Sequence, residues 1–436
     1  MPVDARKSSV ARKVRSLGGQ LIRRWGLVPA GTPDGVGEDE NLVGRPWPFE
    51  VMVYFADTTE AIYQIEQWYR VFESLDAEHR VVVVTRDSRT ARSIRDGSML
   101  EVRTIARAET LDDILGRSKT KLILYVNHNP ENFGALRFGN LLHVSLMHGD
   151  SDKIVTVSNQ TKAYDFSFVA GRAAVERMAR YATLFDADER CIPVGRPQLD
   201  EQAREREAVT LSRPTDDRPT VLYAPTWEGG QPSAAYGSVA THGAAIVRAI
   251  LDDGRFRLIY RPHPLTGVRD AAYGDGDSTI RDLIRRAQDE LPEVGHTVDG
   301  DGDLAVAFGH ADVLICDVSG VAMDWLATGQ PLIVTLPTAD VVVARSALTD
   351  LVPRLPAGDM DGLPNLVARE LDEDPTGAER RALQEFYLGD TTPGASTRRF
   401  IEACERLFRI RDTEVARVAI GELPGEKSVE PRETND

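Results

Sequence analysis

The sequence predicts an α/β protein made of two units, each built on a parallel sheet with helices on both faces. Short, continuous apolar runs rich in β-branched residues alternate with longer amphipathic segments along most of the 436 residues. Continuous apolar runs are typical of strands buried on both faces, and their alternation with helices is typical of a parallel sheet. A polar stretch near residue 205 interrupts this alternation, which then restarts, so the sequence predicts two units.

The first unit is expected over residues 49–205 and the second over residues 206–412. Residues 59–75, which follow the first apolar run, have the spacing of an amphipathic helix. A last helical segment, 395–410, is expected to close the second unit and to cross back to the first. The expected strands are 51–55, 81–84, 122–126, 144–147 and 166–170 in the first unit and 220–224, 257–260, 312–316 and 331–335 in the second.

Both ends of the chain differ from the two units in composition. Residues 1–48 begin with seven Lys or Arg against one acid in the first 25 positions, and apolar residues recur there at helical spacing. This pattern predicts a basic amphipathic helix able to lie on an anionic membrane surface, followed by a Gly, Pro and acid-rich linker at 30–48. A disordered arm or a helix docked on the body would show the same pattern. The tail, 413–436, is polar and acidic and is expected to be disordered.

Charge and cysteine content narrow the class of protein. The formal net charge of −16 excludes a generic nucleic-acid binder. Cys191, Cys316 and Cys404 are widely spaced and form no metal or disulfide pattern. No apolar run is long enough to span a bilayer, and no secretory core follows the basic start. We therefore expect a cytoplasmic protein that its basic helix can hold on the inner face of the cell membrane.

A first candidate site lies where the expected strand 312–316 turns into a helix, at Asp317-Val-Ser-Gly. Ser319 is placed to cap that helix, and Gly320 lets a ligand approach the backbone closely. Helix N-termini attract anions, and ligands of open parallel sheets bind at the carboxyl ends of the strands. Asp324, about one turn further on, could accept hydrogen bonds from sugar hydroxyls. The alternative is structural, with Ser319 only capping and Gly320 only packing.

Two further strands of the second unit end in polar residues fixed by prolines. Thr226 follows the strand 220–224, and Arg261 and His263 follow the strand 257–260. Their hydroxyl, guanidinium and imidazole groups are donors suited to phosphate oxygens. We expect the three strand ends to converge on one edge and form an anion site.

The first unit offers a candidate base. His148, followed by Gly149, comes directly after the expected strand 144–147. Its ordinary pKa lets it take a proton from an attacking hydroxyl near neutral pH, although a structural histidine is equally compatible with this stretch alone. His128 is a weaker candidate and is expected to be a turn residue.

Several common ligand motifs are absent from the sequence. There is no P-loop and no glycine-rich dinucleotide fingerprint after a strand. The stretch 299–303 resembles a calcium loop but has Leu304 and His310 where glycine and glutamate are needed. We therefore expect no metal and no cofactor other than a substrate, with phosphate charge handled by helix ends and side chains.

Taken together, these motifs resemble the CDP-glycerol glycerophosphotransferase family, the teichoic-acid primases and polymerases. The resemblance covers roughly residues 120–405 and implies the GT-B fold, two Rossmann-like domains facing a central cleft. The matching residues are His148-Gly149, Gly195-Arg-Pro-Gln-Leu-Asp200, Ala224-Pro-Thr-Trp227, Arg261-Pro-His-Pro264, Asp317-Val-Ser-Gly320 with Asp324 and Pro331, and the segment 389–400 that opens the last helix.

The resemblance implies a role for each candidate residue. His148 would activate the acceptor hydroxyl, which attacks the β-phosphate of CDP-glycerol while CMP leaves. His263, a second catalytic candidate, would hold the pyrophosphate together with Arg261, Thr226, Ser319 and the Gly320 backbone. Asp324 and Asp317 would bind the nucleotide ribose. The implied acceptor is a lipid-linked or polymeric component of the cell envelope.

Three departures from the family pattern leave other functions open. Asp150 and Asp152 stand near the implied base, Glu228 replaces the arginine that usually follows the Ala-Pro-Thr-Trp motif, and Gly320 replaces a serine. They would allow a different donor such as CDP-ribitol. The alternatives are a GT-B glycosyltransferase or epimerase that uses a UDP- or GDP-sugar, and a catalytically silent nucleotide-binding protein.

Overall fold

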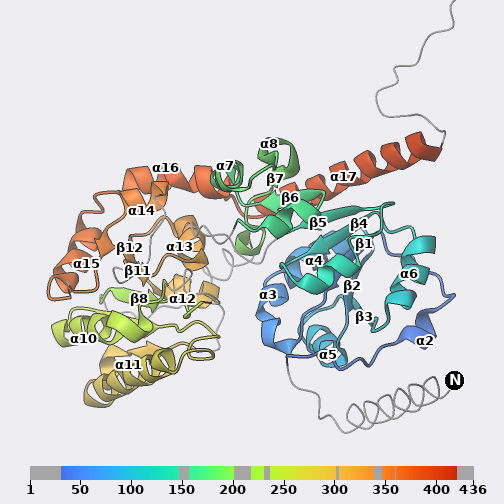
Figure 1. Cartoon of the computed structure of the whole chain (residues 1–436). Coiled ribbons are helices and arrows are strands. Elements are labelled where there is room, and N and C mark those ends of the chain that lie inside the picture. The colour runs from blue at the N-terminus through green and yellow to red at the C-terminus, as the bar shows by residue number, and fades with distance from the viewer. Residues whose placement is uncertain are drawn as a thin grey trace, which may run out of the picture. The chain divides into compact units, whose positions relative to one another are not determined.

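A computed structural model describes residues 31–146, 157–200, 218–229, 236–300, 304–337, 346–358 and 360–419 of the chain. The chain divides into two compact units, coloured along the sequence in Figure 1. The first comprises Met1–His148, Gln160–Ser167 and Ile401–Asp436, and the second Gly149–Asn159 and Phe168–Phe400. The predicted α/β fold with two parallel-sheet units is confirmed.

The first sheet has seven strands in the order β3-β2-β1-β4-β5-β6-β7. The pairs from β3 to β6 are parallel, with Val51 of β1 opposite Val81 of β2 and Leu122 of β4. Every residue of β1, β2 and β4 is buried, as their continuous apolar sequences predict. The strands are β1 (Val51–Phe55), β2 (Val81–Thr85), β3 (Glu101–Thr104), β4 (Leu122–Tyr125), β5 (Leu142–Ser145), β6 (Phe166–Val169) and β7 (Cys191–Pro193).

Helices cover this sheet, but the single helix expected over 59–75 is divided into three short elements. Its buried side chains, among them Ile65, Trp68 and Phe72, still follow the predicted apolar face. The helical elements are α2 (Asp39–Leu42), η1 (Thr59–Ala61), α3 (Tyr63–Glu66), α4 (Tyr69–Asp76), α5 (Ser88–Gly97), α6 (Ala108–Arg117), η2 (Pro130–Gly134) and η4 (Asn159–Ala163).

The described part of the expected linker at 30–48 is packed on the first unit instead of being a free connection. Leu42, Trp47 and the adjoining Phe49 belong to the core cluster beside β1 and β2. The backbone N–H of Asp34 donates to Asp87, and Asp34 in turn accepts from the Ser88 hydroxyl. The Gly and Pro content therefore fits an ordered segment without regular secondary structure over most of its length; residues 31–49 are called the strap below.

The second sheet has six strands in the order β10-β9-β8-β11-β12-β13, and all five pairs are parallel. Four strands lie at or within one residue of the predicted ranges. The strands are β8 (Thr220–Ala224), β9 (Arg257–Tyr260), β10 (Thr297–Val298), β11 (Val313–Cys316), β12 (Leu332–Thr335) and β13 (Arg354–Leu355).

Two apolar clusters bury the two faces of this sheet. Leu314 and Cys316 belong to one cluster, and Val313 and Ile315 belong to the other, as the alternation of side chains along a strand requires. The helices of the second unit are α7 (Arg172–Tyr181), α8 (Ala187–Arg190), η6 (Val239–Gly243), α10 (Ala244–Asp253), α11 (Ala271–Glu290), η7 (Pro292–Val294), α12 (Leu304–His310), α13 (Gly320–Trp325), η8 (Leu326–Thr328), α14 (Ala347–Leu351), α15 (Leu363–Asp372) and α16 (Gly377–Leu388).

The division between the units differs from the boundary expected near residue 205. Strands β6 and β7 belong to the first sheet, yet the chain from Phe168 onward clusters with the second unit. The last helix, α17 (Ala395–Ala419), is also shared, because the division falls at Phe400. It continues past the predicted start of the tail at 413, where Glu414 and Arg417 form an i,i+3 ion pair.

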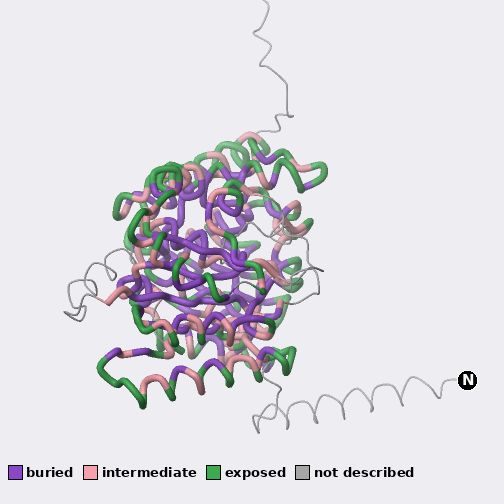
Figure 2. Tube along the Cα trace, turned by 90° about the vertical axis from the view of Figure 1, so that its left-hand side faces the viewer, coloured by how far each residue is buried: buried purple, intermediate pink, exposed green. Residues whose placement is uncertain are grey.

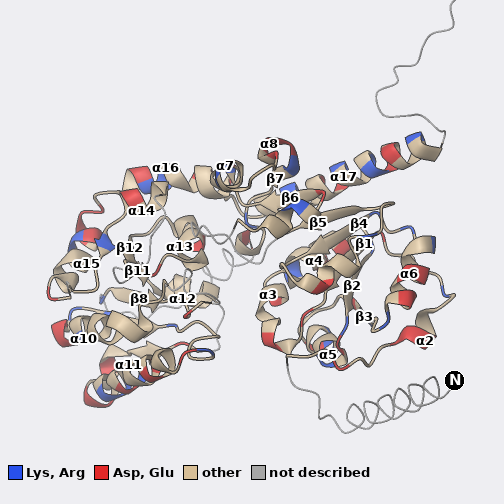
Figure 3. Ribbon diagram, viewed as in Figure 1, with Lys and Arg blue, Asp and Glu red and all other residues tan. Residues whose placement is uncertain are grey.

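Burial and charge follow the expected pattern. Most of the buried residues lie in the interior of the trace (Figure 2), and acidic and basic residues are interspersed on helices such as α11, α15 and α17 (Figure 3). Among the described residues, no helix is long and apolar enough to cross a membrane. The proposed basic helix at 1–25 lies outside the described residues.

Candidate functional site

The site is built at one edge of the second sheet. Strands β9, β8, β11 and β12 are neighbours and run parallel, so their carboxyl ends lie at the same edge. The predicted residues Thr226, Arg261 and Asp317 come within two residues of the ends of three of these strands. The sheet topology therefore brings the three predicted strand ends together, at the edge where open parallel sheets bind ligands.

Asp317 ties these strand ends to one another. Its carboxylate is fully buried and accepts hydrogen bonds from the backbone N–H of Thr226 (2.8 Å) and of Ser238 (3.1 Å). Its other oxygen accepts from the hydroxyl of Thr335 at the end of β12. Burial raises the pKa of Asp317 above its ordinary value, although these hydrogen bonds favour the charged form. Because both oxygens are engaged by the chain itself, Asp317 is placed as an internal brace rather than as a residue facing a ribose.

Trp227 packs against the histidine of the neighbouring loop. The rings of Trp227 and His263 are stacked with centroids 5.9 Å apart and planes 18° apart, and the guanidinium of Arg269 lies 5.5 Å from the Trp227 ring. Nδ1 of His263 accepts a hydrogen bond from the backbone N–H of Leu265 at 3.1 Å. The neutral ring therefore carries its proton on Nε2, where it is a hydrogen-bond donor.

Glu228, which departs from the family pattern, has an internal structural role. It is 6% exposed and accepts hydrogen bonds from the backbone N–H groups of Gly267 (3.0 Å), Arg269 (2.7 Å) and Asp270 (3.2 Å). Burial works to raise the pKa of Glu228, but the backbone N–H donors outweigh it and hold the pKa below its ordinary value. The carboxylate thus anchors the loop that follows His263.

Arg261 is not an isolated cation. Its guanidinium forms an ion pair with Asp299, which directly follows β10, and both side chains are about one-fifth exposed. Its backbone N–H donates to the Tyr223 carbonyl at 2.9 Å, continuing the ladder between β9 and β8. Arg261 is therefore held at the carboxyl edge with part of its charge already balanced.

Ser319 precedes α13 at the N-cap position, with extended backbone angles, but its side chain makes no capping hydrogen bond. The backbone of Ser319 thus has the predicted N-cap conformation, but its hydroxyl does not accept the predicted hydrogen bond from the first turn of α13. Ser319 is 5% exposed, and its Oγ has no hydrogen-bond partner in the described part of the chain. Gly320 opens the helix and is partly exposed.

Asp324, predicted as a ribose ligand, is paired with Arg196 of the Gly-x-Pro-x-x-Asp motif. Nε of Arg196 lies 2.9 Å from Oδ1 of Asp324, and the second guanidinium nitrogen lies 3.0 Å from Oδ2. The two side chains are 8% and 11% exposed. Both carboxylate oxygens are engaged in this bidentate pair, so Asp324 is not presented to a ligand in this structure.

The same motif also holds the last helix. Oδ2 of Asp200 accepts from both the backbone N–H and the hydroxyl of Thr397, each at 2.7 Å, in the first turn of α17. Gly195 has φ of +84°, and a side chain there would collide with Ser396 and Arg399. Sequence reasoning missed the partners Arg196 and Thr397, because nothing local in the sequence pairs residues so far apart.

His148 lies outside the described residues, so the structure does not place it. At the carboxyl edge of the first sheet, the amide nitrogen of Asn127 donates to Asp57 (2.8 Å) and to Gln64 (2.7 Å). Its neighbour His128 stacks on Tyr164, and burial lowers the pKa of His128 to about 4. His128, expected to be a turn residue, is thus a largely buried, neutral imidazole just beyond β4.

Among the described residues, no group of three or more His, Cys, Asp or Glu side chains is arranged to hold a metal ion. The described strand ends instead supply the N–H, hydroxyl, imidazole and guanidinium donors noted above. Such donors suit an anionic ligand such as a diphosphate.

Comparison with known proteins agrees with this chemistry. Residues 66–356 match the model of the family described as CDP-glycerol:poly(glycerophosphate) glycerophosphotransferase. No curated protein matches the chain.

Solved structures share the fold at low sequence identity. The wall teichoic acid polymerase TagF superposes with a TM-score of 0.52 at 14% identity, covering 94% of this chain and 99% of that one. A putative UDP-N-acetylglucosamine 2-epimerase from Listeria monocytogenes gives 0.52 at 12% identity, covering 84% and 98%. A glycosyltransferase from Rickettsia africae gives 0.50 at 11%, covering 83% and 99%.

Proposed function

The chain belongs to the CDP-glycerol:poly(glycerophosphate) glycerophosphotransferase family, and from this premise we propose that it transfers glycerol phosphate from CDP-glycerol to a hydroxyl of a teichoic-acid-like cell-envelope acceptor. The observation that carries the proposal for this chain is the arrangement of polar residues at the carboxyl edge of the second sheet. There, Asp317 holds the strand ends that bear Thr226 and Ser319 within one buried network.

The proposed reaction is a phosphoryl transfer. An acceptor oxygen forms a bond to the β-phosphorus of CDP-glycerol, and the bond from that phosphorus to the bridging oxygen breaks. CMP leaves with the electron pair, and His148 takes the proton of the attacking hydroxyl. Positioning and preorganised donors supply the rate enhancement in such reactions.

The donor-binding roles are distributed over the second unit. We assign the pyrophosphate to His263 through its Nε2 proton, with Thr226, Arg261, Ser319 and the Gly320 backbone. The buried hydrogen bonds and ion pair of Asp317 and Asp324 support positioning roles for these two residues in place of direct ribose contacts.

The acceptor and the membrane belong to the proposal as well. A lipid-linked or polymeric acceptor would lie at a membrane surface, and a basic amphipathic segment at 1–25 suits attachment to anionic lipids. Deleting residues 1–30 should then reduce binding to anionic vesicles while leaving CDP-glycerol binding unchanged. Equal vesicle binding by the full and shortened chains would show that residues 1–30 do not attach the protein to a membrane.

Calorimetry tests the donor assignment without knowledge of the acceptor. We expect CDP-glycerol to bind more tightly than CDP-ribitol, UDP-N-acetylglucosamine or a GDP-sugar, and His263→Ala to weaken that binding at least tenfold. His242→Ala, a buried histidine of η6, is the matched control and should leave donor affinity within threefold. Preference for a UDP- or GDP-sugar would favour the sugar-nucleotide alternative, and no nucleotide binding would overturn the donor site.

A further inference from the structure

A cavity of about 490 Å³ lies in the first unit. Its walls come from the strap that precedes β1, from Arg80 just before β2, and from the edge strand β3. Residues 46–49 and Arg80 precede their strands, so this end of the cavity lies at the amino edge of the sheet. Ligands of open parallel sheets bind at the opposite, carboxyl edge, so the cavity is distinct from the site that the family chemistry uses.

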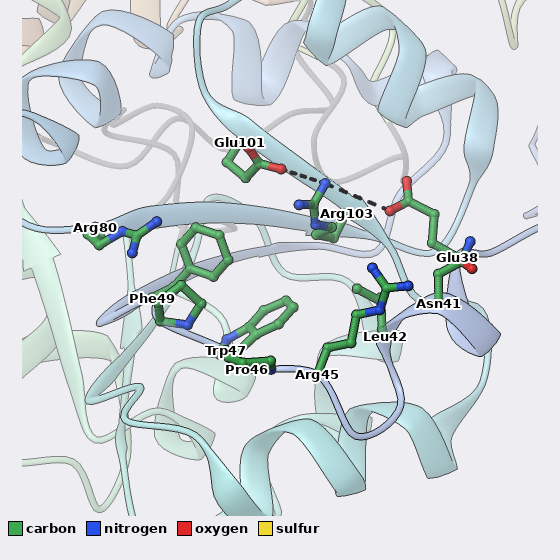
Figure 4. A pocket seen from close by; sticks show the side chains of 11 residues that line it. Glu38, Asn41, Leu42, Arg45, Pro46, Trp47, Phe49, Arg80, Glu101 and Arg103 are labelled. Carbon is green, nitrogen blue, oxygen red and sulfur yellow. Dashed lines mark ion pairs between the residues drawn. The ribbon is translucent and has the colours of Figure 1, made fainter.

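The cavity carries positive charge that the described residues do not balance. Arg103 is paired with Glu101 (2.5 Å) and lies 3.9 Å from Glu38, which is itself bound to Arg95 (2.6 Å). Arg45 and Arg80 are exposed, and in the described part of the chain neither has a carboxylate partner. Figure 4 shows the three lining arginines around the rings of Trp47 and Phe49. In a chain of net charge −16, two unbalanced arginines in one cavity favour an anionic ligand.

The apolar side of the cavity limits the ligand further. Trp47 and Phe49 pack edge to face with centroids 5.1 Å apart, and each is only 7% exposed. They present narrow strips rather than open ring faces, which suits the CH and CH₂ groups of a polyol better than a stacked base or an acyl chain. The indole N–H of Trp47, which lines the cavity, is buried with no acceptor in the described part of the chain, so it is an unsatisfied donor beside the cavity.

We propose that this cavity is a second binding site, which holds a glycerol phosphodiester segment of the growing acceptor chain through Arg45, Arg80 and the Trp47 indole. The arginines pair with phosphate oxygens, and the aromatic strips contact the glycerol carbons. The identity of the ligand rests on the proposed function, whereas the site itself rests on the geometry of the cavity. Retention of the polymer at a second site would keep the product bound between successive additions.

Binding of a defined glycerol phosphate trimer to the full chain tests this proposal by calorimetry at low ionic strength. We expect the double variant Arg45→Ala and Arg80→Ala to weaken trimer binding at least tenfold, with CDP-glycerol affinity unchanged. The matched control removes two exposed arginines elsewhere, Arg92→Ala and Arg286→Ala, and should leave trimer affinity within threefold. Equal losses in the two double variants would show a general charge effect and overturn the site.

Two further measurements locate the ligand and identify its source. Quenching of tryptophan fluorescence by the trimer should disappear in Trp47→Phe, and quenching that persists there would place the ligand elsewhere. Phosphatidylglycerol vesicles carry the same glycerol phosphodiester. If the chain binds these vesicles through Arg45 and Arg80 but does not bind the trimer, the ligand of the cavity is a lipid headgroup and the polymer assignment is wrong. Trimer binding without CDP-glycerol binding would contradict the proposed function but not this second site. CDP-glycerol binding without trimer binding would contradict this second site but not the proposed function.

Discussion

Arg196 and Asp324 form a buried bidentate ion pair within the second unit, between the loop after β7 and helix α13. They are 128 positions apart in the sequence. The pair joins two of the motifs that carry the family resemblance. A buried pair of this geometry is costly to break, because removal of one partner leaves the other charge without compensation.

Arg196→Ala should therefore lower the free energy of unfolding by about 3–5 kcal/mol, measured by denaturant titration. The matched control is Arg285→Ala, which breaks the exposed i,i+3 pair with Asp282 and should cost less than about 1 kcal/mol. Replacing both partners, with Arg196→Leu and Asp324→Leu, should recover much of the loss. A similar small cost for Arg196→Ala and Arg285→Ala would contradict the structural role of the buried pair.

Asp317→Asn should weaken CDP-glycerol binding at least tenfold, because a neutral amide oxygen holds the backbone N–H groups of Thr226 and Ser238 less strongly, and the amide NH₂ takes away the acceptor of the Thr335 hydroxyl. Asp312→Asn is the matched control. Asp312 accepts from the backbone N–H of Thr220 at 2.8 Å, at the amino edge of the same sheet. Both variants should lose stability, and only Asp317→Asn should lose donor affinity. If Asp312→Asn weakens donor binding equally, Asp317 acts only through general stability.

The effect of Glu228→Gln should depend on pH. The pKa of Glu228 is lowered in the folded chain, because the backbone donors that oppose the burial effect favour the carboxylate. The folded state thus binds its proton less readily than the unfolded state, and the resulting stability is present above the ordinary pKa of 4.5. This stability is lost as the pH falls through the folded pKa. We expect Glu228→Gln to cost about 2 kcal/mol at pH 7.

The gap between Glu228→Gln and the unchanged chain should close as the pH is lowered below 4.5, where the native carboxylate also becomes protonated. Urea titrations at several pH values measure the gap. A constant difference between pH 7 and pH 4 would show that the charge of Glu228 does not contribute, and that shape alone holds the loop after His263.

His128 should remain neutral well below its ordinary pKa. Burial lowers the pKa of His128 from 6.5 to about 4, so the unfolded chain binds a proton at pH values where the folded chain does not. Stability should therefore decrease as the pH falls from 6.5 towards 4, and His128→Gln should flatten that decrease. The His128 imidazole resonance can be assigned in NMR spectra by its loss in His128→Gln. Titration of that resonance near pH 6.5 would contradict the burial of the His128 ring.

Asp200→Ala should loosen the start of α17. The variant removes the acceptor for both the backbone N–H and the hydroxyl of Thr397, at a cost of about 1–2 kcal/mol. Hydrogen exchange should rise most at residues 396–398. Asp390→Ala is the control, since Asp390 accepts from Thr392 outside the helix and is exposed. Unchanged protection of the first turn in Asp200→Ala would show that packing alone holds the helix.

Much of the fold was predictable because its signals are local. The continuous apolar runs of β1, β2, β8 and β11 mark strands buried on both faces, and the alternation with helices requires a parallel sheet. The restart of the pattern near residue 205 indicated two units. The crossing of the last helix back to the first unit was also predicted, and the division at Phe400 agrees with it. Short-range patterns do not define packing, so the packed segment at 31–49 was not predicted.

For the candidate site, the sequence by itself determined which residues follow which strand: Thr226 after β8, Arg261 and His263 after β9, and Ser319 with its glycine after β11. The parallel order of the strands makes their convergence predictable. Only the tertiary structure decided what each polar group bonds to. It turned Asp317 and Asp324 inward to Thr226 and Arg196, and it made Glu228 a loop anchor. The reason is physical: strand identity depends on residues next to each other in the chain, whereas a buried carboxylate takes the partners that folding brings within about 3 Å, whatever their separation in sequence.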